Sequence, residues 1–243
     1  KVSDAEWVKL EAHMTRCPGT CNTMGTASTM TSIVEALGLA LPGSTSIPAM
    51  DAGHTRMATT CGERIVQMVW DDLTPRQILT RGAFMNAAAV QMALGGSTNA
   101  AVHIIAMARR AGVDLTLDHL DAIGREVPVL ANLFPSGDRL MEDFHYAGGL
   151  PALMSRITPH LFLDQRNVNG KTLGENLEGV QVLDDAVIRP LNNPVSANGA
   201  LAVLRGNLAP EGAVMKASAA SPKFFKHRGR AIVFDNPAAM NQA

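Results

Sequence analysis

Two cysteines, Cys17 and Cys21, lie close together in the stretch RCPGTCNTMGTASTM, residues 16–30. Paired thiols can bind a metal, and a single thiol just before a helix can be a ligand or a nucleophile because the helix dipole lowers its pKa. The C-x3-C spacing differs from that of a zinc knuckle, and no second Cys or His pair follows at ligand spacing. These residues argue against a zinc finger and leave Cys21 open as a thiolate ligand, a nucleophile or a small buried loop residue.

Hydroxyl-bearing residues surround the same expected helix start, in TMGTAST. Such a loop can hold a carboxylate or phosphate, but Ser and Thr also gather at helix starts for capping alone. Two histidines, His54 and His145, lie near acidic residues in stretches that we expect to be loops. They could reach a substrate there, or they could only form hydrogen bonds within the loop. We expect His103 to be a core residue of an all-apolar helix and Cys61 to be buried at a helix N-terminus.

Composition and missing motifs exclude several classes of function. The formal net charge is -1 and the one basic run, SPKFFKHRGR, is short, so neither a nucleic acid nor a membrane is an expected partner. No dinucleotide fingerprint, P-loop, nucleophile elbow or H-E-x-x-H motif is present. Three cysteines favour a reducing compartment, which we expect to be the cytoplasm. The chain begins without Met inside an amphipathic pattern, which suggests the central piece of a longer protein.

Periodic apolar residues predict several helices. One covers 28–39 with Thr26 or Ser28 as its cap, and one opens at Thr74-Pro75 and runs to Gly95-Gly96. Ser97 or Thr98 should cap the next, which Gly112 ends. We also expect a surface helix at 117–125, a short buried strand at 127–132 and a Pro-initiated helix at 148–157.

The composition changes near residue 187. Short runs of β-branched and small residues then follow, at 200–207, 212–218 and 230–236, separated by turn residues. We therefore expect an α/β protein. A helix-rich domain with a buried sheet covers 1–187 and is incomplete at its N-terminus, and 188–243 begins a β-rich, barrel-like domain.

Four ordered motifs carry a family resemblance. They are GTCNTMGTASTM with EALGLALPG, GGSTNAAVHIIAMAR, FHYAGGLPALM, and GNLAPEGAVMKAS with GRAIVFD. Together they resemble the dihydroxy-acid dehydratase / phosphogluconate dehydratase family over nearly the whole chain. Within it, CNTMGTASTM is most similar to the sugar-acid branch, which includes arabinonate and xylonate dehydratases.

The resemblance implies an iron–sulfur-dependent hydro-lyase that converts a sugar acid, a 2,3-dihydroxy acid, to a 2-keto-3-deoxy acid. It implies a 2Fe-2S cluster (4Fe-4S being the alternative), Mg²⁺, and a serine base located downstream, so that no catalytic residue lies in this chain. Cys21 matches a cluster cysteine, whereas Cys17 and Cys61 match none. The segment with Asn22, Thr23, Met24 and Thr26 should bind the substrate.

Alternatives remain at this point. One is dihydroxy-acid dehydratase of branched-chain amino-acid synthesis, and another is a non-catalytic iron–sulfur sensor or an inactive fragment. The upstream Cys-Asp-Lys and downstream serine motifs of the family are absent from this chain. We therefore expect the isolated chain to be inactive and the full-length protein to be a homo-oligomer, a dimer or tetramer.

Overall fold

The computed structural model describes residues 2–14, 19 and 21–242, so Cys17 lies outside the described residues. Its helices are α1 (Asp4–Met14), α2 (Thr26–Ala36), α3 (Ala52–Trp70), α4 (Pro75–Ile78), α5 (Arg81–Ala93), α6 (Thr98–Arg110), α7 (Leu117–Glu126), α8 (Met141–Tyr146), α9 (Gly149–Arg156), α10 (Leu173–Leu177) and α11 (Pro237–Gln242). Short 3-10 helices cover Ser44–Ser46, Thr158–His160, Ala217–Ala219 and Pro222–Phe224. The strands are β1 (Leu201–Gly206) and β2 (Ala209–Lys216).

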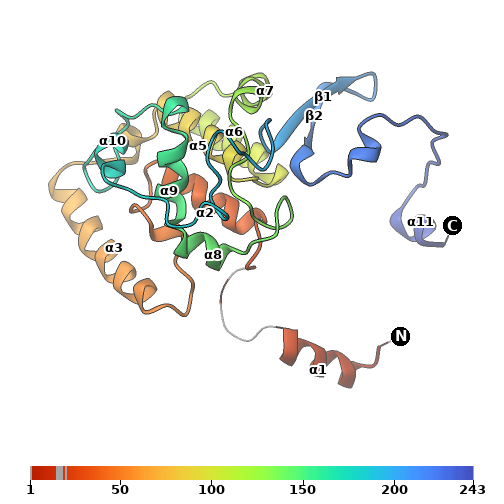
Figure 1. Ribbon diagram of the computed structural model, residues 1–243, viewed down its shortest axis with the longest axis horizontal. Coiled ribbons are helices and arrows are strands. Elements are labelled where there is room, and N and C mark those ends of the chain that lie inside the picture. The colour runs from red at the N-terminus through yellow and green to blue at the C-terminus, as the bar shows by residue number, and fades with distance from the viewer. Residues whose placement is uncertain (1, 15–18, 20, 243) are drawn as a thin grey trace.

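Helix α5 forms the centre of the helical body, and α2, α6, α7 and α9 pack around it (Figure 1). Its sequence, RGAFMNAAAVQMA, is rich in alanine, so neighbouring helices can approach its backbone closely. Phe84 and Ala87 to Val90 are almost completely buried. Small residues thus allow one helix to be covered on nearly all sides.

The expected long helix from Thr74 to Gly95 is divided into α4 and α5, which corrects the prediction. Thr80 adopts an extended conformation between them, and its hydroxyl oxygen accepts a hydrogen bond from Ala83 N at 3.1 Å. The Thr80 hydroxyl also donates to the side-chain oxygen of Gln165, a distant residue. The new cap and this long-range contact end one helix and start the next.

Helix α3 begins earlier than the sequence predicts, at Ala52 and not near Cys61. Asp51 caps it by accepting a hydrogen bond from Gly53 N at 2.6 Å, so the stretch 51–56 is a helix start and not a loop. His54 therefore lies in the first turn of α3. Cys61 lies in the middle of the helix and is exposed, which corrects its expected burial at a helix N-terminus.

Helix α6 has a polar face, and the expectation of an all-apolar helix is wrong. Ser97 caps it as predicted, by accepting from Asn99 N at 3.2 Å. Its buried face contains Ala100, Ile104 and neighbouring small residues. His103 lies on the exposed face, because only one side of α6 packs on the body. The stretch around His145 is likewise helix α8 and not a loop.

The expected strand at 127–132 is an extended, buried segment without a regular sheet partner. Val129 and Ala131 form isolated bridges to Ser196 and Ile188, respectively. The segment after 187 therefore packs onto the helical body before the β-region begins. The described part of residues 1–187 forms no regular sheet, and the expected strand instead makes these two bridges to the segment after 187.

Strands β1 and β2 form an antiparallel hairpin with Leu201 opposite Lys216. The hairpin packs beside α6 and α7, and the chain after it runs away from the body (Figure 1). The third expected strand, 230–236, is exposed and has no strand structure. The described residues form many helices and a small sheet toward the C-terminal end, which confirms the predicted α/β class. Across residues 2–14, 19 and 21–242, no helix combines the length and apolar character needed to cross a membrane.

Candidate functional site

Cys21 is exposed in the loop that leads into α2. The helix begins at Thr26 with Gly25 as its cap, and neither Thr26 nor Ser28 has the capping role expected of it. Gly25 has no side chain with which to cap, so the first N–H groups of α2 have no side-chain acceptor from that position. Cys21 thus precedes the start of α2 by five residues and is exposed to solvent.

Asn22 ties this loop to helix α8. Its backbone carbonyl accepts from Met141 N at 3.1 Å, and its side-chain oxygen accepts from Glu142 N at 2.9 Å. Met24 N donates to the carbonyl of Phe134 at 2.8 Å. Two segments that lie far away in the sequence therefore hold the loop in place. The side chain of Asn22 is exposed next to Cys21.

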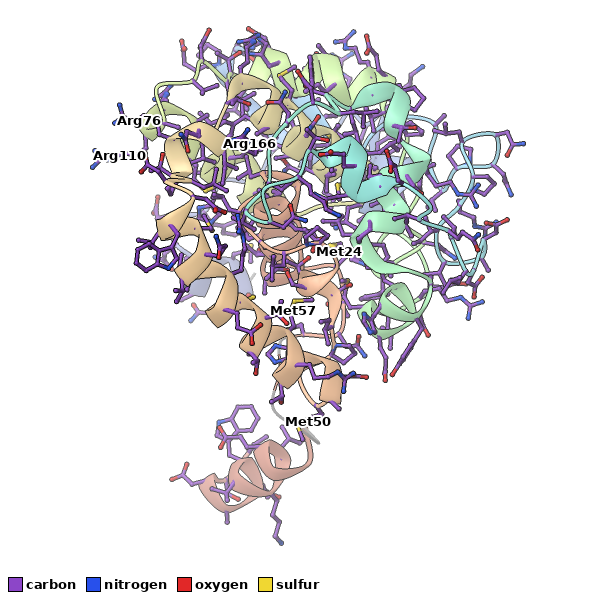
Figure 2. The ribbon with its side chains drawn as sticks, turned by 90° about the vertical axis from the view of Figure 1, so that its left-hand side faces the viewer. Met24, Met50, Met57, Arg76, Arg110 and Arg166 are labelled. Atoms are coloured by element: carbon purple, nitrogen blue, oxygen red, sulfur yellow. The ribbon has the colours of Figure 1, made fainter. Side chains whose placement is uncertain are left out.

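Met24 turns its side chain into the core. Only 2% of this residue is exposed, and its sulfur accepts a hydrogen bond from the Thr29 hydroxyl at 3.4 Å. Figure 2 shows Met24 in the interior of the helical body. Among the predicted substrate-binding residues, Met24 can therefore offer a ligand only its backbone. Thr23 and Thr26 are partly exposed.

A cluster of polar side chains joins the N-termini of α2 and α6. The hydroxyls of Thr26 and Ser97 are 3.1 Å apart, and Asn99 Nδ2 donates to Thr26 Oγ1 at 2.8 Å. Ser97 N donates to Thr29 Oγ1 at 3.0 Å. The sequence pattern predicts only a capping role for Ser97 and gives no indication of a role for Asn99. The GGSTN motif alone carries no signal that it faces the cysteine loop.

Lys216 approaches the same loop from the end of β2. Its Nζ donates to the carbonyl of Met24 at 3.5 Å. Burial lowers the pKa of the Lys216 ammonium, because a partly buried site favours the uncharged form. No sequence motif points to this lysine. A lone lysine in a strand gives no sequence signal of a partner that lies far away along the chain.

An open groove of about 1060 Å³ runs between α6 and β2 and is bordered by Asn99. Its lining also includes Arg109 of α6, Arg205 of β1 and Asp118 of α7, together with residues of β2. Arg205 pairs with Asp118, so charges of both signs are already partly matched there. Asn99 therefore links the hydroxyl cluster to a space large enough for a small molecule.

The described residues do not by themselves make an iron–sulfur site. In the ranges 2–14, 19 and 21–242, no group of three or more His, Cys, Asp or Glu side chains is arranged to hold a metal. Cys21 is a single soft donor of the type that iron–sulfur clusters use, whereas such clusters need several thiolates. Cys61, on α3, takes no part in this loop. A cluster at Cys21 would therefore require donors beyond the described residues.

Comparison with known proteins identifies the family. The model for the N-terminal domain of dihydroxy-acid/6-phosphogluconate dehydratases matches residues 1–176. The corresponding C-terminal domain model matches residues 186–243. The chain therefore belongs to the dihydroxy-acid/6-phosphogluconate dehydratase family, as the four motifs predict.

Three curated relatives show how the chain compares with full-length members. A 6-deoxy-6-sulfo-D-gluconate dehydratase of Pseudomonas putida is 53% identical over 99% of this chain and 42% of its own length. An L-arabinonate dehydratase of Rhizobium leguminosarum bv. trifolii is 50% identical, over 97% of this chain and 41% of its own length. A dihydroxy-acid dehydratase of Caldicellulosiruptor bescii is 46% identical, over 97% of this chain and 43% of its own length. The chain thus spans about two fifths of the length of these relatives.

Proposed function

We propose that this chain is part of an iron–sulfur-dependent dehydratase that converts a sugar acid to a 2-keto-3-deoxy acid. The observation that carries the proposal is that the short segment after Cys21 makes two separate polar contacts: Thr26 contacts Ser97 and Asn99, and the Met24 carbonyl contacts Lys216. Hydroxyl and amide groups suit a polyhydroxylated molecule, and a cation suits its carboxylate. The family and the names of the relatives support this class of reaction.

Cys21 is proposed as one thiolate of a 2Fe-2S cluster, with 4Fe-4S as the alternative, and Mg²⁺ as the second cofactor. When bound, the cluster would supply a Lewis acid for the departing hydroxyl group. Asn22, Thr23 and Thr26 would orient the sugar acid by hydrogen bonds beside that thiolate. The proton-abstracting serine belongs to the remainder of the full-length protein. We also propose that the full-length protein is a cytoplasmic homo-oligomer and that the present chain by itself is inactive.

Dihydroxy-acid dehydratase is the second candidate function, because relatives with this name are 44% to 46% identical to the chain. Its substrate, 2,3-dihydroxyisovalerate, has apolar methyl groups in place of the sugar hydroxyls. Such a substrate has fewer groups that can form hydrogen bonds with the hydroxyl and amide side chains of this cluster. The polar cluster therefore favours the sugar acid.

The test is a comparison of substrates with the full-length, cluster-loaded protein. We expect 2-keto acid formation from L-arabinonate, D-gluconate or 6-deoxy-6-sulfo-D-gluconate. The best of these should exceed 2,3-dihydroxyisovalerate in kcat/KM by about 100-fold, because the poorer substrate forms fewer hydrogen bonds with the site. A preference for 2,3-dihydroxyisovalerate would establish the second candidate. No turnover of any of them would contradict the enzyme proposal and favour an iron–sulfur sensor.

A further inference from the structure

Lys216 is held in position by the β-hairpin. It is the last residue of β2 and lies opposite Leu201 of β1, which is 95% buried. The same strand packs against α6. This packing fixes the end of the strand beside the Cys21 loop, and the long side chain of Lys216 extends to Met24. The strand thus brings a cation from the second family domain to the loop of the first.

The ammonium group of Lys216 has unused bonding capacity. It carries three N–H donors, and the Met24 carbonyl accepts at 3.5 Å, which is long for a hydrogen bond. None of the ion pairs in the described part of the chain includes Lys216. A half-buried cation is costly to keep without an anionic partner. Such a group is suited to an anion that binds from solution.

The surroundings of Lys216 favour an oxyanion with hydroxyl groups nearby. The Met24 carbonyl that Lys216 contacts is two residues before Thr26, whose hydroxyl meets Ser97 and Asn99. Arg205, on the neighbouring strand β1, is already paired with Asp118 in the groove. Of Arg205 and Lys216, Lys216 is therefore the cation that has N–H donors available near the loop.

We propose that Lys216 binds an anionic oxygen group of the substrate at the Cys21 loop, an inference that rests on the proposed sugar-acid dehydratase function. Two groups of a sugar acid have the required chemistry. One is the carboxylate, which every sugar acid carries, and the other is an acidic substituent at the far end of some sugar acids. The ammonium donates N–H to the oxyanion while the Met24 carbonyl keeps the side chain extended.

The experiment uses the full-length, cluster-loaded protein with Lys216→Met and Lys216→Arg. Lys216→Met should raise KM by about 10- to 100-fold, the value of a hydrogen bond to a charged group, with a smaller effect on kcat. Lys216→Arg should restore most of the affinity because the positive charge is kept. Lys226→Met, at an exposed lysine in the chain after β2, is the matched control and should leave KM unchanged. The visible absorbance of the cluster should be the same in all four proteins.

Two substrates identify the bound group. If Lys216→Met raises KM equally for D-gluconate and 6-deoxy-6-sulfo-D-gluconate, Lys216 binds the carboxylate. If only the sulfonated substrate is affected, it binds the terminal group. Unchanged KM for both would overturn the proposal, as would loss of cluster absorbance in both Lys216 variants, which would reveal a structural role.

A binding measurement separates this proposal from the proposed function. Calorimetric titration of each protein with the same two sugar acids reports affinity without turnover. If the wild-type protein turns over neither but Lys216→Met binds them more weakly, the dehydratase proposal fails and the anion-binding role stands. Equal affinity of the Lys216→Met and wild-type proteins would overturn the role of Lys216, whatever the turnover.

Discussion

The Cys21 loop and helix α3 both present an exposed cysteine near several threonines, yet they differ in what holds them. In α3, Thr59 and Thr60 donate only to carbonyls one helical turn earlier. In the Cys21 loop, the hydrogen bonds run to α6, α8, β2 and the segment at Phe134. Residue types alone therefore do not distinguish the candidate site. The difference lies in the groups near each cysteine: the residues after Cys21 contact several distant segments, whereas α3 reaches a distant segment by a hydrogen bond from Arg64 to the Val168 carbonyl.

Burial shows the same difference between the two regions. Of the α3 residues only Met68 is buried, and Ile65, Val69 and Trp70 are mostly exposed. In α2, which follows the Cys21 loop, Thr29, Ser32 and Ile33 are at most 1% exposed. Substitutions in the loop and its supports should consequently have larger effects than matched substitutions in α3.

The largest contrast is expected between the two cysteines. In the full-length protein, Cys21→Ser should abolish the visible absorbance of the iron–sulfur cluster together with dehydratase turnover, because an essential thiolate is lost. Cys61→Ser is the control and should retain both. Absorbance spectra and 2-keto acid formation measure the outcome. Retained absorbance and turnover in Cys21→Ser would contradict its assignment as a ligand.

Two glycines should give effects of opposite sign on stability. A Cβ at Gly96 would lie 2.9 Å from the Gln91 carbonyl oxygen and 3.0 Å from Thr29 Cγ2. Gly96→Ala should therefore separate α6 from α2 and lower the free energy of unfolding by about 1–3 kcal/mol. Gly62, inside α3, has no atom within 4 Å of such a Cβ. Gly62→Ala should raise that free energy by about 0.5–1 kcal/mol, because alanine favours a helix.

Chemical unfolding of the full-length protein and both variants measures this difference through the unfolding midpoint. Destabilisation by both substitutions would show that α3 is packed as tightly as the α2–α6 contact. Stabilisation by both would show that the close approach at Gly96 does not constrain the site.

Two carboxyl groups, near the ends of α2 and α3, should give the smallest effects, with opposite dependence on pH. Burial raises the pKa of Glu35 above its ordinary value of 4.5, although hydrogen bonds from Thr45 and Gly43 oppose the shift. The native state then binds the proton of the Glu35 carboxyl more tightly than the unfolded state does. The contribution of this group to the free energy of unfolding is therefore complete below pH 4.5 and is lost as pH rises through the raised pKa. Hydrogen bonds from Gln67 and then Arg64 lower the pKa of Asp71 below 3.8. The contribution of Asp71 to the free energy of unfolding is present above pH 3.8 and is lost as pH falls through the lowered pKa.

The measurement is the unfolding midpoint as a function of pH for Glu35→Gln and Asp71→Asn. Glu35→Gln should weaken the loss of stability toward neutral pH, and Asp71→Asn should weaken the loss at acid pH. Each is the control for the other. A Glu35→Gln profile parallel to that of the wild type would show that the buried carboxyl does not titrate differently in the native state.

Several features of the structure follow from the sequence because they depend on residues within one helical turn. The cap at Ser97 and the helix end at Gly112 were predicted from such signals and are confirmed. The four motifs, including the cysteine loop, identified the family, which the comparisons confirm. The roles of Cys21, Asn22, Thr23, Met24 and Thr26 in binding stay predictions.

Other features were decided only by the tertiary structure. Gln165 contacts Thr80 across 85 residues of sequence and accompanies the break between α4 and α5. Burial turns Met24 away from solvent, and one-sided packing exposes His103. Lys216 meets Met24 across 192 residues. A local sequence pattern determines which hydrogen bonds a single turn can make, whereas packing of the whole chain determines which distant groups come close enough to act together.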